Sequence, residues 1–306
     1  MNHDYKYQVS IIIITYNSSS YIKNCLISVI KFIQHYQYEI IIIDNNSDDN
    51  IENIISEFQN VFFIKNKDNI GFARACNQAI KISQGEYIFL LNPDTIILNN
   101  VFEIFIKYME SDENKNIWCV GGQLVSEFDE PIKSELNFPT IFKVILEQSG
   151  IKGILIKVFG KLYSRKNVIK SEKGVDVIAG ADLFIKKDLQ KEIGFFNEKF
   201  FLNYEEAELF WRAKKLGYKS YLLPQAKICH FSSKSFSSKK SYLFHLWYGQ
   251  LLFFKLTHKK FVFTIIKVIH LLGVFARLIV KLDLDYYEHF LKVKKLKYDI
   301  CHNYNI

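Results

Sequence analysis

The chain has 306 residues, of which 49% are hydrophobic, 24% are charged and 16% are aromatic. It is long enough for one large domain or for one domain with an appendage, and its charged fraction is ordinary for a globular protein. The formal net charge of +8 suits anionic partners such as nucleotides, phospholipid surfaces or nucleic acid, and does not choose among them. The five cysteines are scattered and lack CxxC spacing, which argues against a disulfide framework or a zinc cluster and indicates a reducing compartment.

The sequence pattern argues against three further features: a signal peptide, a membrane-spanning helix and a nucleic-acid-binding motif. The first residues lack the basic and long apolar regions of a signal peptide. The longest apolar stretch begins at Phe261 and is interrupted by Lys267, His270 and Arg277, so we expect no membrane-spanning helix. The aromatic residues are not interleaved with Lys and Arg in a recognised nucleic-acid motif, so we expect no nucleic-acid partner.

Strands and helices alternate strictly over the first 91 residues. The predicted strands are 9–14, 39–44, 61–64 and 87–91, and the predicted helices between them carry apolar residues at helical spacing over 22–33, 51–58 and 72–80. Short connections and right-handed crossovers then predict a Rossmann-like, mostly parallel sheet with helices on both faces. In such a sheet the ligand crevice lies beyond the carboxyl ends of the strands.

The pattern becomes less regular from Ile117 onward. We predict a strand and a turn over 117–125, short strands at 175–177, 183–185 and 220–223, and a helix over 204–216. The apolar and basic segment 138–163 could cover a substrate site or belong to an interface. A stretch rich in Ser and Lys after His230 predicts a domain boundary near Ser235, which gives a domain 1–235 and a C-terminal extension 236–306.

The C-terminal extension predicts a long amphipathic helix. Its polar residues recur at three- and four-residue steps and leave a broad apolar face: Lys260, Thr264, Lys267, His270, Arg277 and Lys281. Such a helix could pack on the first domain or on a dimer partner, or it could lie in an anionic membrane surface. The basic run from Lys292 to Lys297 favours the membrane.

Polar residues follow the predicted strands at the edge where a ligand would bind. Thr15 to Asn17 follow the first strand, Asp44 ends the second, and Asn92 to Asp94 follow the fourth in the sequence "NPD". Each also has a purely structural interpretation, because Asn, Pro and Asp are common at strand ends and in turns.

A cluster of acidic residues opens the predicted helix 204–216. Glu205, Glu206 and Glu208 stand close together there, and Glu206 is a candidate functional carboxylate. Glu208 and Arg212 form an i, i+4 pair in the favourable order, so the cluster could instead be a solvated helix face.

Seven segments in order resemble family-2 glycosyltransferases of the A-type nucleotide-sugar fold, in particular the rhamnosyltransferase-like branch. They run from Val9 to about Ser235 and read "VSIIIITYN", "IIIIDNNSDDN", "NIGFARACNQAI", "GEYIFLLNPDT", "GADLFIKKD", "GFFNEKFFLNYEEAELFWRAKKLGY" and "ICHFSSKS". The resemblance implies that fold for the first domain.

The resemblance implies a nucleotide-sugar donor at the strand edge. By position it assigns donor contacts to Thr15, Tyr16, Asn17, Asp44, Arg74, Asn77, Asn92 and Asp94. Exposed strand-end amides can meet a phosphate, and a carboxylate can accept from a base or a ribose hydroxyl. Arg74 could equally be an exposed helix cation.

The "NPD" turn resembles the family's Asp-x-Asp motif, with Asn92 in place of the first acid. The resemblance implies that Asp94 binds Mg²⁺ or Mn²⁺, which proteins often hold with one or two carboxylates and the substrate phosphates. His230 lies where related enzymes supply a histidine to the metal or the diphosphate. A lone His can equally be structural.

Glu206 aligns with the family's catalytic base, which is usually an Asp, so its carboxylate is one methylene longer here. Glu205 or Glu208 could share the role, and Glu205 is also a candidate on the acceptor side. Gly180, Ala181 and Asp182 resemble the family's acceptor-side loop. With Glu206 as base, the resemblance implies an inverting transfer in which an acceptor hydroxyl attacks the anomeric carbon.

The resemblance implies transfer of a sugar, rhamnose if the branch holds, to a bacterial surface-glycan acceptor such as a lipid-linked intermediate of lipopolysaccharide or capsule. The expected location is the cytoplasm, at the inner face of the cytoplasmic membrane, and a homodimer is compatible with the sequence. Two alternatives stay open: a nucleotide-sugar-binding protein without turnover, and a peripheral membrane scaffold that uses its helical tail.

Overall fold

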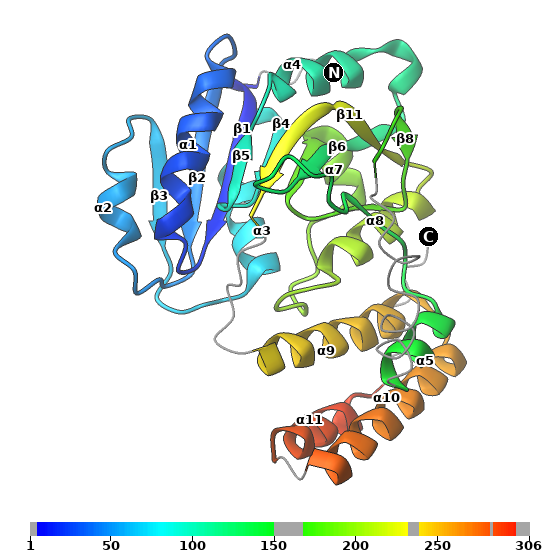
Figure 1. Ribbon diagram of the computed structural model, residues 1–306. Coiled ribbons are helices and arrows are strands. Elements are labelled where there is room, and N and C mark those ends of the chain that lie inside the picture. Colours follow the sequence, from blue (N-terminus) through cyan, green and yellow to red (C-terminus); the bar gives the residue numbers. More distant parts are fainter. Residues whose placement is uncertain (1–4, 150–167, 232–238, 282–283, 298–306) are drawn as a thin grey trace. The chain divides into compact units, whose positions relative to one another are not determined.

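The computed structural model describes residues 5–149, 168–231, 239–281 and 284–297 (Figure 1). The chain divides into two compact units. The first comprises 1–137, 166–201 and 209–235, and the second comprises 138–165, 202–208 and 236–306. The predicted boundary near Ser235 lies outside the described residues and stays a prediction. The described residues of 138–165 and the segment 202–208 group with the C-terminal helices, which local sequence pattern did not indicate.

A nine-stranded mixed sheet forms the centre of the first unit, in the order β3-β2-β1-β4-β10-β6-β11-β5 with β8 beside β11 (Figure 1). Its strands are β1 (Tyr7–Thr15), β2 (Tyr38–Asp44), β3 (Val61–Lys65), β4 (Gly85–Leu91), β5 (Thr95–Ile97), β6 (Ile117–Val125), β8 (Lys173–Gly174), β10 (Asp182–Lys186) and β11 (Lys219–His230). The strands β1 to β4 are parallel, as are β6 and β11, whereas β10 and β5 run antiparallel to their neighbours. The predicted mostly parallel sheet is confirmed.

Helices cover both faces of this sheet. They are α1 (Ser19–Ile33), α2 (Ile51–Ile55), α3 (Phe72–Ile82), α4 (Val101–Glu110), α7 (Lys187–Ile193) and α8 (Glu205–Lys215), with a 3₁₀ turn η1 (Asp112–Asn114) after α4. Helix α8 begins in the second unit and continues in the first. A separate two-stranded ribbon joins β7 (Glu135–Leu136) to β9 (Val177–Ile178).

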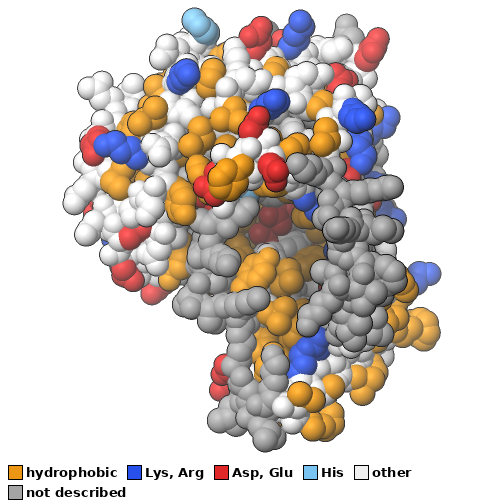
Figure 2. Space-filling view, viewed as in Figure 1, with side chains coloured by type: hydrophobic (Ala, Val, Ile, Leu, Met, Phe, Trp, Pro, Cys, Tyr) orange, Lys and Arg blue, Asp and Glu red, His pale blue; other side chains and the backbone are white. Residues whose placement is uncertain are grey.

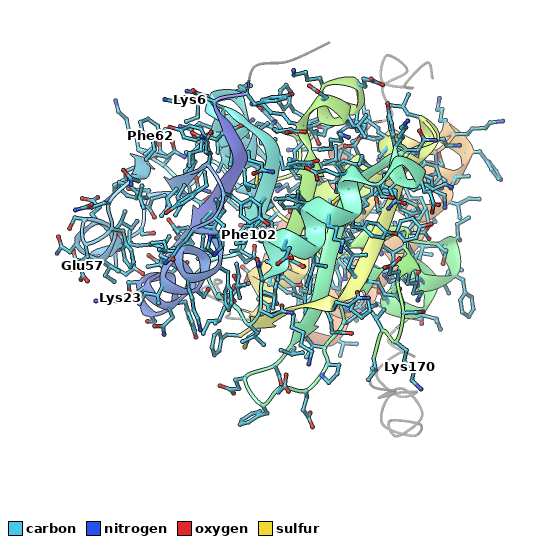
Figure 3. All side chains as sticks on the ribbon, turned by 90° about the horizontal axis from the view of Figure 1, so that it is seen from above. Lys6, Lys23, Glu57, Phe62, Phe102 and Lys170 are labelled. Carbon is cyan, nitrogen blue, oxygen red and sulfur yellow. The ribbon has the colours of Figure 1, made fainter. Side chains whose placement is uncertain are left out.

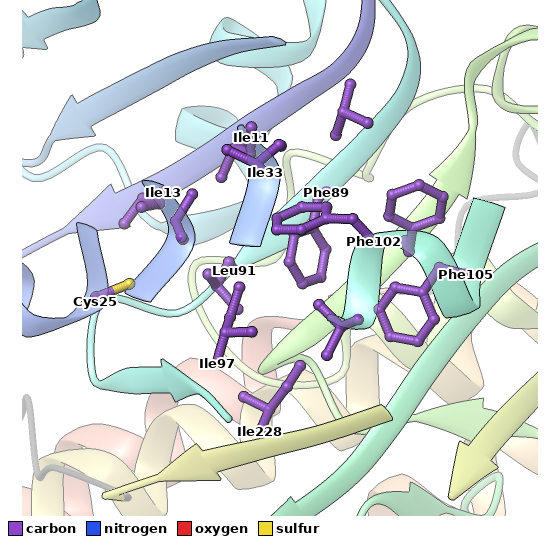
Figure 4. Close-up of a cluster of buried hydrophobic side chains, with 14 of the residues drawn as sticks. Ile11, Ile13, Cys25, Ile33, Phe89, Leu91, Ile97, Phe102, Phe105 and Ile228 are labelled. Carbon is purple, nitrogen blue, oxygen red and sulfur yellow. The ribbon is translucent and has the colours of Figure 1, made fainter. Parts of the chain in front are cut away.

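Aliphatic strand residues and aromatic helix residues build the core of the first unit. Phe89 of β4 packs edge to face on Phe102 and Phe105 of α4, with ring centroids 5.6 and 5.9 Å apart (Figure 4). Phe102 lies between α4 and the sheet, whereas Lys23 and Glu57 form an exposed ion pair of 2.6 Å at the periphery (Figure 3). This continuous core holds the strands in place, and with them the sheet edge where the polar residues at the strand ends lie.

Three predicted elements differ from the structure. Strand β6 continues through Gly121 and Gly122 where we predicted a turn. These glycines serve close packing instead, because a Cβ would lie only 2.6 Å from Ile178 at Gly121 and 2.5 Å from the Ala226 carbonyl at Gly122. The strand predicted at 175–177 is two short strands, β8 and β9. Strand β11 extends far beyond 220–223 and passes Pro224 at an irregularity between Leu223 and Lys227, where a missing donor is tolerated.

The second unit is helical. It contains α5 (Ile141–Gln148), α9 (Lys239–Thr257), α10 (Lys260–Lys281) and α11 (Leu284–Lys295), so the single long helix predicted for the extension is three helices. The ring of His289 on α11 stacks on Phe244 of α9 at 4.6 Å, and the Arg277 guanidinium lies 4.8 Å from the centre of the Trp247 ring. These contacts give the unit its own core.

Helix α10 turns its polar residues inward and part of its apolar surface outward. His270 is fully buried, and the ammonium group of Lys267 donates to the carbonyls of Lys294 and Leu296 at the end of α11. By length and composition, Lys260–Val280 could cross a membrane, and it is the one such helix in the described residues. The residues that argued against a membrane span are thus paired inside the unit, and the absence of a span stays a prediction.

Candidate active site

The carboxyl ends of β1 and β2 are locked together by Asp44. Thr15 pairs with Asp44 in the strand register, and its hydroxyl donates to Asp44 Oδ1 over 2.8 Å. The backbone N–H of Ser47 donates to Asp44 Oδ2 over 2.9 Å, and the Ser47 hydroxyl also donates to this carboxylate. The fully buried carboxylate therefore holds the loop after β2 in shape.

The loops after β1 and β2 interlock through Asn17. This residue has a left-handed φ of 52°, its N–H donates to the Ser47 hydroxyl over 2.8 Å, and its side-chain oxygen accepts from the N–H of Asp48 over 3.0 Å. Tyr16 is half-buried beside it. Sequence reasoning missed Ser47 and Asp48, and the only signal was the turn composition of "NNSDDN".

Helix α3 begins at a position that only glycine fits. Gly71 has a φ of +85°, and a Cβ there would lie 2.7 Å from the carbonyl oxygen of Phe201, which accepts from the N–H of Phe72 over 2.8 Å. Arg74 follows on the same helix. Its side chain is 56% exposed and lies 3.9 Å from Glu198, so it is available to an anionic ligand.

Asn77 makes three hydrogen bonds within the first unit. Its amide donates to the Phe196 carbonyl over 2.9 Å and to Glu198 over 3.0 Å, and its oxygen accepts from the Phe196 N–H over 3.0 Å. The side chain is buried. Asn77 therefore holds the loop that carries Glu198, the partner of Arg74, and a direct donor contact would require these bonds to open.

Asp94 and His230 meet at the same sheet edge. Strand β11 pairs antiparallel with β5, so His230 stands opposite Thr95, and Phe231 donates to the Asp94 carbonyl over 3.0 Å. His230 Nε2 lies 3.3 Å from Asp94 Oδ1, and both side chains keep some exposure, 17% and 7%. The structure thus brings together the two residues predicted to bind metal.

This pair fits a divalent cation. Two ligands at right angles around an ion about 2.1 Å away lie about 3 Å apart, which matches the observed separation. A carboxylate oxygen suits Mg²⁺ or Mn²⁺, and a neutral imidazole is a common additional ligand. Among the described residues no group of three or more His, Cys, Asp and Glu is placed to hold a metal, so phosphate oxygens would complete the shell.

Asn92 ties the "NPD" turn to the predicted acceptor-side segment. Its N–H donates to the Ala181 carbonyl over 3.0 Å, and its own carbonyl accepts from the Thr95 hydroxyl over 2.7 Å. Asn92 thus supports the turn through its backbone, whereas Gly180 and Ala181 lie next to the edge that carries Asp94.

Asp182 lies in the interior of the sheet rather than on an open acceptor surface. It pairs with Leu91 at the start of β10, and its side chain is fully buried. Its Oδ2 accepts from the N–H of Gly122 over 2.5 Å, and its Oδ1 has no hydrogen-bond partner. Burial raises the pKa of the Asp182 carboxyl well above its usual range.

The acidic start of α8 belongs to the second unit. Glu205 and Glu208 are buried, and Glu206 is partly exposed. Burial raises the pKa of Glu206, while burial and the neighbouring Glu206 charge raise the pKa of Glu205 well above its usual range. A carboxylate whose pKa is raised is a stronger base, so the direction of the Glu206 shift fits its predicted role.

The alternative interpretation of this cluster as a solvated helix face is wrong. Glu208 is fully buried, and Arg212 is 5% exposed. The Arg212 guanidinium donates to the carbonyl of Ile193 and, over 2.6 Å, to that of Phe195, which joins α8 to the end of α7. Glu205, Glu208 and Arg212 are therefore buried in the fold, and Arg212 is held by specific contacts.

Comparison with known proteins places these observations in a family. A model described as glycosyl transferase family 2 matches residues 10–171. Over 177 residues the chain is 28% identical to the uncharacterized glycosyltransferase MJ1057 of Methanocaldococcus jannaschii, covering 54% of this chain and 61% of that protein. Over 218 residues it is 26% identical to the low-salt glycan biosynthesis hexosyltransferase Agl10 of Haloferax volcanii, covering 68% and 62%. The chain thus spans about three fifths of the length of these curated relatives.

The fold is that of A-type glycosyltransferases. The mannosyltransferase PcManGT of Pyrobaculum calidifontis, solved with GDP-Man and Mn²⁺, superposes with a TM-score of 0.55 over 95% of this chain and 74% of that chain, at 14% identity. This likeness confirms the predicted fold class. Since the family model matches more than half of the sequence, this chain belongs to glycosyl transferase family 2.

Proposed function

We propose that this protein is a metal-dependent glycosyltransferase that moves a sugar from a nucleotide-diphosphate donor to an acceptor hydroxyl. The observation that carries the proposal is the pair of Asp94 and His230, 3.3 Å apart at the carboxyl edge of the sheet. This is the edge where open α/β sheets bind ligands, and the interlocked loops after β1 and β2 end there too.

The donor contacts follow from this arrangement. Asp94 and His230 would hold Mg²⁺ or Mn²⁺, which when bound stabilises the negative charge of the leaving diphosphate. The loop of Tyr16 and Asn17, which Asp44 and Thr15 hold in place, would receive the nucleoside. Arg74 is exposed and would pair with a phosphate if it left Glu198, because that ion pair is long and mostly solvated.

Glu206 would act as the general base. It would take the proton of the acceptor hydroxyl as that oxygen attacks the anomeric carbon, and the bond to the diphosphate would break on the opposite face with inversion. Its raised pKa supports this role, because a base works best when its pKa lies near the working pH. The convergence of Glu206 and Asp94 on one donor is part of this proposal.

The sugar is a hexose in this proposal, and rhamnose if the branch resemblance holds. The hexosyltransferase Agl10 is a relative named for glycan biosynthesis, which supports a glycan acceptor. We propose a bacterial surface glycan on a lipid carrier, of the lipopolysaccharide or capsule kind, and an enzyme that works in the cytoplasm at the inner face of the membrane.

Charge and surface both support the membrane part of the proposal. Residues 236–306 hold twelve Lys and Arg against four Asp and Glu, which equals the full net charge of +8, while residues 1–235 are neutral overall. Exposed apolar side chains recur along one side of α10: Phe261, Val268, Leu272, Phe275 and Ile279. Figure 2 shows hydrophobic side chains, in orange, exposed at the lower right of the molecule. An apolar row on a basic unit suits an anionic bilayer surface.

A screen of nucleotide sugars tests the donor class. Purified protein is heated with each sugar nucleotide in the presence of Mn²⁺ or Mg²⁺, and a donor at one hundred times its Kd should add about 2.7 kcal/mol of stability. Release of the nucleotide diphosphate on adding acceptor would establish turnover. Stabilisation without release would favour the alternative of a binding protein, and no stabilisation by any donor would overturn the proposal.

A further inference from the structure

Two strained residues stand immediately before the acidic pair of α8. Asn203 and Tyr204 have φ values of 69° and 71°. Asn tolerates this left-handed region, but a bulky Tyr rarely adopts it, and such a conformation persists only where the surrounding structure enforces it. Because Glu205 is the first residue of α8, these two residues set the direction in which the helix and its carboxylates begin.

Helix α9 enforces this conformation through close packing. A Cβ on Gly249 would lie 2.5 Å from the carbonyl oxygen of Asn203 and 3.3 Å from the Tyr204 ring, so only glycine lets the helix approach so closely. The amide of Gln250 donates to the Tyr204 hydroxyl over 2.9 Å. All of these residues belong to the second unit.

Gln250 is itself held from two sides. Its amide also donates to Glu147 over 3.0 Å, and its oxygen lies 3.1 Å from His270 Nε2. The other ring nitrogen of His270 lies 3.0 Å from the amide of Gln148. A neutral His270 that accepts at Nδ1 and donates from Nε2 satisfies both contacts, and burial lowers its pKa to about 3. Gln250 is therefore held in one orientation toward Tyr204.

We propose that Gly249 and Gln250 are positioning residues for Glu206, acting through Asn203 and Tyr204. This proposal rests on the proposed function, in which Glu206 is the base. The C-terminal helical unit thus has a role in catalysis apart from any contact with a membrane or a second copy, since a misplacement of about 1 Å at a reacting group can reduce a rate by about 10²-fold.

Replacing Gln250 with Leu tests the proposal. The Gln250→Leu variant removes the hydrogen bond to Tyr204 and keeps a buried side chain of similar size. We expect kcat to fall roughly 10- to 100-fold while KM for the donor stays within about twofold. The matched control is His289→Leu, which removes a buried polar side chain of the same unit that stacks on Phe244, and should keep the wild-type kcat.

A double-mutant cycle identifies the route of the effect. If Gln250 acts through Tyr204, the variant carrying both Tyr204→Phe and Gln250→Leu should lose no more kcat than the worse single variant. The positioning role would be overturned if the loss of kcat in the double variant equalled the product of the two single losses, or if Gln250→Leu kept the wild-type kcat. The transferase function would stand in either case.

Hydrogen exchange makes the test independent of turnover. Gln250→Leu should speed amide exchange in 202–208 relative to His289→Leu, while the strands of the sheet keep their protection. If the wild-type protein released no nucleotide diphosphate with any donor, the proposed function would fail. Faster exchange in Gln250→Leu would even then support the inference that Gln250 fixes the conformation of 202–208. Unchanged exchange would contradict it.

Discussion

His230 Nε2 lies 3.3 Å from Asp94 Oδ1, although a large part of the first unit separates them along the chain. The contact exists because β11 returns antiparallel beside β5 and sets His230 opposite Thr95. A carboxylate and an imidazole so close at a ligand-binding edge predict a shared cation.

Replacing Asp94 with Asn should remove the stabilisation by donor and metal. The change keeps the size of the side chain and removes the charge that a divalent ion needs, so the thermal shift produced by Mn²⁺ and donor together should fall by more than half. The control Asp129→Asn alters an exposed Asp with a φ of 56°, a conformation that Asn tolerates. Equal shifts in Asp94→Asn and the wild type would contradict the metal role.

Replacing Glu206 with Gln should abolish turnover and spare donor binding. General-base assistance is worth about 10²- to 10⁴-fold, so kcat should fall by that factor with an unchanged Kd for the donor. The control is Glu288→Gln, an exposed residue of α11. A kcat within threefold of the wild type would assign the base elsewhere, with Glu205 the next candidate.

The pH dependence of turnover should show the raised pKa of Glu206. A base must be deprotonated to act, so kcat rises as the pH passes through the pKa of the base. Burial raises the pKa of Glu206, so this rise in kcat should occur at a higher pH than for an ordinary Glu. A pH profile of kcat at saturating donor measures it. A limb that stays below pH 4.5, the ordinary value of this side chain, would contradict the assigned environment.

The raised pKa of Asp182 should make the protein less stable as pH rises. Its folded-state pKa lies well above the unfolded value of 3.8, so the folded state binds the extra proton between the two values. Over that range the free energy of unfolding decreases with pH, by up to about 1.4 kcal/mol per pH unit. Asp182→Asn should remove this slope in denaturant titrations at several pH values, and an unchanged slope would show an ionised Asp182.

Apolar contacts of α10 should govern binding to lipid vesicles. Phe275 is 48% exposed on α10, and Phe62 of β3 is 56% exposed in the first unit. Phe275→Ser should reduce cosedimentation with vesicles rich in anionic lipid several-fold, whereas Phe62→Ser should not. Equal binding to neutral and anionic vesicles would contradict the charge argument, and a concentration-dependent dimer that Phe275→Ser disrupts would assign this face to a second copy.

Sequence pattern predicted the sheet and its ligand edge because these depend on local periodicity. Runs such as Val9 to Ile14 alternate with helical spacing, and the carboxyl ends of parallel strands meet by geometry. The same reasoning predicted that Asp44 and Asp94 stand at one edge. It placed no element over 95–110, where β5 and α4 lie.

Contacts between distant segments were not predictable in this way. The sequence assigned Asn77 a contact to the nucleotide-sugar donor. In the structure it instead bonds Phe196 and Glu198, which follow more than one hundred residues later in the chain. The periodicity of α10 gave two faces without showing that His270 points inward. The strained pair before α8 depends on Gly249, which local pattern gave no reason to single out.

The central claim is that Asp94 and Glu206 serve one donor, and a crystal structure with donor and Mn²⁺ tests it most directly. We predict an ion bound to Asp94, His230 and the diphosphate, with the Glu206 carboxylate within about 3 Å of an acceptor hydroxyl or of a water in its place. An ion bound away from Asp94, or a Glu206 carboxylate directed away from the anomeric carbon, would contradict it.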